Sequence, residues 1–94
     1  MFVKLNKLEI QNTGRSREYY IREVFINTDT VVSVTANQDI TNFLRTEAPE
    51  FGNSLFSNVV VNTDRNGQSP IVVIGSPTAI VEALNGKKKE LLHD

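Results

Sequence analysis

The chain has 94 residues and carries ten Lys and Arg against eleven Asp and Glu, with one His and no Cys. This length predicts one domain, with no room for a second core of independent stability, and the lack of Cys excludes disulfide bonds, thiol catalysis and the usual zinc sites. The near-neutral charge argues against a domain whose main task is to coat nucleic acid, because counterion release needs clustered cations. No stretch approaches the roughly 18 apolar residues of a membrane span, and the N-terminus lacks the apolar region of a signal peptide. We therefore expect a protein of the cytoplasm, either of a cell or of an infected host.

The first predicted strand covers 2–10 and changes its apolar face midway. Its apolar residues are first odd-numbered and then even-numbered: Val3, Leu5, Leu8 and Ile10. This change predicts either a bulge near Asn6 and Lys7 or a strand that is partly covered on both faces. The polar segment 11–17 contains Gly14 and is predicted to be a loop.

Two further strands are predicted after this loop. The segment 18–27 is rich in β-branched and aromatic residues, and the polar residues 27–30 have the composition of a turn. The next strand is 31–35, and the simplest expectation is that it pairs antiparallel with the strand before it.

A short helix is predicted over 37–47, where three apolar residues have helical spacing: Ile40, Phe43 and Leu44. Either Asn37 or Asp39 is suited to cap its start. The helix is expected to end before Pro49, because a proline disfavours helical backbone in the residue before it. The segment 50–54 is then the best candidate for a loop.

A β-hairpin is predicted from the strands 55–61 and 69–74, joined by a polar segment that contains Asn66 and Gly67. Both strands hold continuous apolar runs of Val and Ile. Both faces of the hairpin therefore need cover, which we expect from a helix on one side and from another subunit on the other.

The last predicted helix has a well-marked start and end. Ser76 is a good N-cap, Pro77 suits the first helical position, and Asn85 and Gly86 are typical of a helix end. Three residues form its expected buried stripe: Ile80, Val81 and Leu84. The remaining segment, 87–94, is a charged tail.

These elements predict one α+β domain over 1–86, followed by the charged tail 87–94. The domain contains about five mainly antiparallel strands, a short middle helix and a C-terminal helix packed on the sheet. Exposed Val-rich strands in so small a domain favour self-association, so we expect a homo-oligomer.

The sequence offers little support for catalysis. The single histidine, His93, is one residue from the C-terminus, where fraying of the chain leaves no third group to hold the imidazole in place. Glu47 and Glu50 flank a turn with proline, and no spacing singles out a pair of carboxylates for general acid and base roles. We predict no catalytic residue and a protein that is not an enzyme.

Metal and phosphate motifs are incomplete. Residues 62–67 match the opening of a calcium loop with Asn in place of the first Asp, but Val73 stands where the loop needs a bidentate Glu. Residues 75–77 join a strand to a helix without the glycine pattern of a phosphate loop. We therefore predict no metal and no cofactor.

The positive charges are concentrated near the N-terminus. Residues 1–23 carry five positive and three negative charges, whereas residues 24–64 carry one positive and five negative. A basic first hairpin with two tyrosines suits contact with nucleic acid or a small anionic ligand. The candidate contact residues are Arg15, Arg17, Tyr19, Tyr20 and Arg22. The alternative is that these cations protect an edge strand.

Two parts of the chain resemble small flagellar proteins of the FlbD type. The first part is the strand that ends in residues 24–29 with the strand 31–34 after it, and the second is 71–77 followed by 80–84. Similar short sequences occur among uncharacterised phage-encoded proteins, and residues 37–58 look inserted relative to this pattern. The resemblance implies a small non-enzymatic β-rich protein and brings no catalytic residues with it.

Two functions remain open at this point. The first is a non-enzymatic structural or regulatory binding protein that acts as a homo-oligomer, with a further protein partner allowed. The alternative is a protein that binds nucleic acid or a small anionic ligand through the basic first hairpin.

Overall fold

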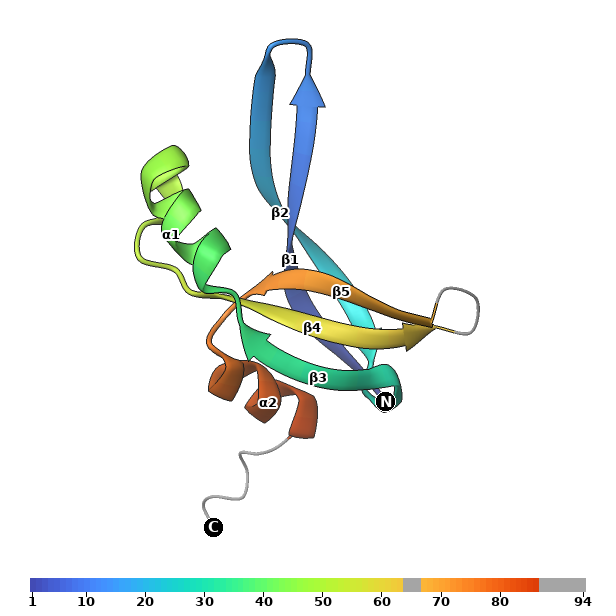
Figure 1. Ribbon diagram of the computed structural model, residues 1–94. Coiled ribbons are helices and arrows are strands. Elements are labelled where there is room, and N and C mark those ends of the chain that lie inside the picture. The colour runs from blue at the N-terminus through green and yellow to red at the C-terminus, as the bar shows by residue number, and fades with distance from the viewer. Residues whose placement is uncertain (64–66, 87–94) are drawn as a thin grey trace.

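The computed structural model describes residues 1–63 and 67–86, which form one antiparallel sheet and two α-helices (Figure 1). The α+β prediction is therefore confirmed. In chain order the elements are β1 (Phe2–Thr13), β2 (Ser16–Asn27), the 3₁₀ turn η1 (Thr28–Thr30), β3 (Val31–Ala36), α1 (Gln38–Glu47), the 3₁₀ turn η2 (Pro49–Phe51), β4 (Phe56–Thr63), β5 (Gly67–Ile74) and α2 (Pro77–Asn85). The predicted tail 87–94 lies outside the described residues.

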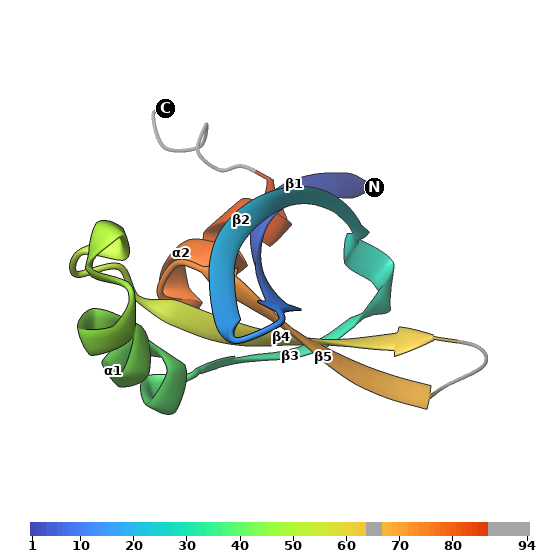
Figure 2. The same cartoon turned by 90° about the horizontal axis from the view of Figure 1, so that it is seen from above.

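The strand order in the sheet is β2-β1-β5-β4-β3, and all pairs are antiparallel. The expected pairing of β3 with β2 is wrong, because β3 pairs with β4 instead. In this position Val34 lies opposite Val59, which is fully buried, and Val34 packs against the same core. Burial of apolar side chains thus decides the pairing, and the short η1 turn only connects the two outermost strands. Figure 2 shows how the sheet curls between them.

The β1–β2 hairpin is longer than the sequence indicates. Both strands run up to a two-residue turn, with Thr13 paired to Ser16 and with Gly14 at φ 61°. The expected loop at 11–17 is therefore mostly strand. Its side chains are all exposed, so they bear no apolar pattern of the kind that marks a half-buried strand.

The change of apolar face in β1 comes from cover on both faces and not from a bulge. The register with β2 is unbroken from Phe2 to Thr13. β1 crosses β5 where Lys7 pairs with Val73. Before this crossing Leu5 is buried in one core cluster, and after it Leu8 is buried in the other.

Two core clusters lie on opposite faces of the sheet. Val73 belongs to one cluster, whereas its neighbours Val72 and Ile74 pack in the other, as alternation along a strand requires. α2 covers the first face through Ile80, and α1 covers the second through Leu44. The apolar runs of β4 and β5 thus receive cover on both faces from this same chain, although Val60, Val61 and Ile71 stay only partly buried; the cover expected from another subunit stays a prediction.

Both helices begin as the sequence predicts. Of the two candidate caps for α1, Asn37 is the one used, since its Oδ1 accepts the N–H of Ile40 at 3.0 Å. Ser76 caps α2 by accepting the N–H of Ala79 at 3.1 Å. The predicted buried stripe of α2 is only partly correct, because Ile80 is buried but Val81 is 41% exposed.

Candidate interaction surface

The outer half of the β1–β2 hairpin stands away from the rest of the sheet (top of Figure 1). We call residues 9–20 the arm. Every residue from Ile10 to Glu18 is exposed. Because a two-stranded hairpin alone is marginally stable in water, an arm of this length contributes little to folding.

The five predicted contact residues do not share one face of the arm. Arg17 and Tyr19 lie on the face that also carries Ile10, since Ile10 is the register partner of Tyr19. Tyr20 and Arg22 point to the opposite face, and Arg15 is in the turn. The structure therefore divides this set into two surfaces and a tip.

Tyr19 is also engaged with α1. Its ring meets the ring of Phe43 edge to face, with 6.1 Å between the centroids and 71° between the planes. The side chain is half-buried at the margin of the cluster around Leu44. An edge-to-face pair of this kind fixes where α1 lies beside the arm.

Ion pairs distinguish the base of the arm from its tip. Glu9 lies 3.3 Å from the Lys7 ammonium and 3.8 Å from the Arg22 guanidinium, so Arg22 is partly neutralised. At the tip, the Arg17 Nε donates to Asn12 Oδ1 at 3.3 Å. Neither Arg15 nor Arg17 forms a salt bridge with any residue that the structure describes. The tip thus has two positive charges that no salt bridge between described residues neutralises, and the exposed carboxylate of Glu18 follows Arg17 in the strand.

Sequence reasoning did not identify a row of exposed residues on α1. Asp39, Phe43 and Glu47 are spaced four residues apart and share one side of the helix. Phe43 is 41% exposed, while Thr41 is buried and accepts the N–H of Phe56 at 3.0 Å. The sequence does contain a signal for this row, namely an acidic residue four positions before Phe43 and another four positions after it.

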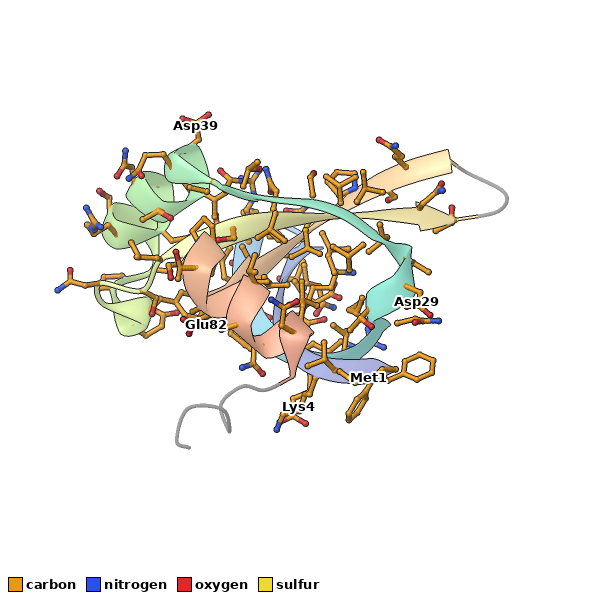
Figure 3. All side chains as sticks on the ribbon, turned by 90° about the horizontal axis from the view of Figure 1, so that it is seen from below. Met1, Lys4, Asp29, Asp39 and Glu82 are labelled. Carbon is orange, nitrogen blue, oxygen red and sulfur yellow. The ribbon has the colours of Figure 1, made fainter. Side chains whose placement is uncertain are left out.

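A second apolar surface lies at the base of the hairpin. Met1, Phe2 and Phe25 are each more than 60% exposed. Phe2 and Phe25 are diagonal neighbours, because their register partners are Asn27 and Lys4. In Figure 3 Met1 and Lys4 are labelled close together at this margin of the molecule.

We also searched residues 1–63 and 67–86 for a metal site and for a membrane-spanning helix. Within this part of the chain, no group of three or more His, Cys, Asp or Glu residues is placed to hold a metal ion. The described helices include none that is long and apolar enough to cross a membrane. An open hollow beside α2 is lined by Pro77, Thr78, Val81 and Glu82.

Comparison of the chain with protein-family models, with curated proteins and with solved structures finds no match. The resemblance to flagellar FlbD-type and phage-encoded proteins stays a prediction.

Proposed function

We propose that this protein is a non-enzymatic structural or regulatory binding protein that acts as a homo-oligomer. The observation that carries this proposal is the arm, which extends the β1–β2 hairpin well past the two cores and exposes its side chains on both faces. A cytoplasmic location is part of the same proposal.

The reason for self-association differs from the one that the sequence suggests. The centres of the apolar strands β4 and β5 are already buried beneath α1 and α2. Several large apolar side chains around the hairpin and α1 remain exposed, among them Phe2, Ile10, Phe25 and Phe43. These residues form two separate groups, one at the base of the hairpin and one beside the arm, and exposed apolar groups of this kind are typical of interaction surfaces.

The test is the oligomeric state of the full chain. Light scattering coupled to size-exclusion chromatography, over a concentration series up to the high micromolar range, should show a mass above 10.5 kDa that rises with concentration. A mass that stays at the monomer value through the whole series would contradict the proposal.

A second candidate function is binding of nucleic acid or a small anionic ligand. The two arginines at the tip of the arm favour this function. Arg15 and Arg17 are exposed there without salt bridges to described residues. This function predicts salt-dependent retention on heparin that is lost in R15A/R17A and kept in R45A, where the cation lies on α1. Absence of any retention at low salt would exclude it.

A further inference from the structure

One face of the arm and the row on α1 carry opposite charges and adjoin one another at a single aromatic contact. The arm contributes Ile10, Arg17 and Tyr19, and α1 contributes Asp39, Phe43 and Glu47. The two sets meet where the rings of Tyr19 and Phe43 touch. We call the first set the arm row and the second the helix row. Figure 1 shows the arm and α1 rising side by side from the sheet.

The charges of the two rows are not satisfied within one molecule. Among the described residues no salt bridge involves Arg17 of the arm row, and none involves Asp39 or Glu47 of the helix row. All three side chains are exposed. The surface is thus basic on the arm side, acidic on the helix side and apolar between them.

Such a surface is complementary to a copy of itself. In a two-fold dimer each residue contact occurs twice, with the two partners exchanged. Placing the arm row of one molecule on the helix row of the other brings Arg17 to the acidic side chains in both directions. It also covers Ile10 and Phe43, which are 48% and 41% exposed in the single chain.

A nucleic acid is a poorer occupant of the same surface. A nucleic acid that covered both rows would bring phosphates to the acidic side chains of Asp39 and Glu47 as well as to Arg17, and like charges brought together at an interface are strongly unfavourable. Arg45 does not relieve this repulsion, because it lies two residues from both Phe43 and Glu47 and so on the opposite side of α1.

We propose that a second copy of this chain binds to this surface, so that the arm of each molecule lies on α1 of the other. The proposal rests on the proposed homo-oligomeric function and names its interface. Opposite charges at the margin of an interface mainly raise the rate at which the two molecules associate, and salt screens this attraction. Dissociation of the dimer is therefore expected to increase with ionic strength.

A pair of charge-reversed chains tests this arrangement. The first carries R15E/R17E in the arm, and the second carries D39N/E47R in the helix row. In a dimer of either variant with itself, the arm and the helix row that face each other carry charges of the same sign at both contacts. We therefore expect the dissociation constant of each variant to increase by about tenfold or more. Mixed together, the two variants regain opposite charges at both contacts and should form a mixed dimer with near-original affinity.

Two variants serve as matched controls. R45E reverses a cation on the far side of α1, and D29N removes an acid from η1, which Figure 3 shows well away from Asp39. Both should dimerise like the original chain. Circular dichroism of each variant checks that its fold is retained, and sedimentation velocity or light scattering measures association.

The results of these experiments distinguish a failure of the proposed interface from a failure of the proposed homo-oligomer. A dimer that survives in both reversed variants, or reversed variants that do not recover on mixing, would overturn the interface and leave the homo-oligomer in place. An original chain that stays monomeric would overturn both.

Discussion

The two halves of the β1–β2 hairpin share one unbroken register but are stabilised by different means. In the inner half Leu5 and Val24 are opposite one another and pack with the core that α2 covers. In the outer half, beyond Leu8 and Ile21, the side chains are mostly exposed. The inner half is held by burial of apolar area, whereas the arm depends on its ladder hydrogen bonds and on the contact with α1. The same strand pair thus serves both folding and presentation of a surface.

The largest difference is expected between buried and exposed phenylalanines. Phe56 is 1% exposed and belongs to the cluster under α1, whereas Phe25 is 67% exposed. F56A should lower the free energy of unfolding by about 3–5 kcal/mol, because it leaves a cavity. F25A should change it by less than about 0.5 kcal/mol. Urea denaturation of both variants measures this, and equal losses would contradict the division between core and surface.

Two glycines with positive φ provide the next contrast. Gly75 has φ 131°, and a Cβ there would lie 2.9 Å from Ile80 Cδ1 in the core, whereas Gly14 has φ 61° in the arm turn with open space around it. G14A should cost about 1–2 kcal/mol of stability through backbone strain alone. G75A adds a steric clash with α2 and should cost more, about 2–4 kcal/mol. Thermal unfolding compares them, and a larger loss for G14A would count against this account.

The adjacent tyrosines of the arm should also differ. Tyr19 packs on Phe43, whereas Tyr20 lies on the other face and is 44% exposed. Y19A should cost about 1–2 kcal/mol, because it removes an aromatic pair and partly buried area. Y20A should cost less than about 0.5 kcal/mol. Chemical denaturation at low protein concentration separates this from any effect on association.

The smallest effect is expected at the tip of the arm. R15A/R17A removes two exposed side chains that form no salt bridge with described residues, so the free energy of unfolding should stay within about 0.5 kcal/mol of the original. Hydrogen exchange offers a related measurement, since amides near Thr13 should exchange much faster than those of β4 and β5. Strong protection of the arm in dilute monomer would show that it is more firmly held than its contacts suggest.

Local chemistry was predictable where a few neighbouring residues decide the outcome. Ser76 followed by Pro77 predicts the start of α2, and the structure has its cap there. Asn37 was one of two candidates for α1, and its side chain makes a second bond to Asn58 Oδ1 at 3.0 Å that no local pattern reveals. The candidate contact residues were correctly placed on one hairpin, but their division between two faces depends on the register with β1.

The sequence by itself determined the order of the main strands and helices, the cap of α2 and the two-sided apolar character of β4 and β5, because propensity, capping and hydrophobic alternation act over a few residues. Only the tertiary structure decided that β3 pairs with β4, that α1 and α2 cover opposite faces, and that Phe43 lies at the surface beside Tyr19. These features depend on contacts between residues far apart in the chain, where many pairings satisfy the same local rules. Burial of the largest shared apolar area selects among them.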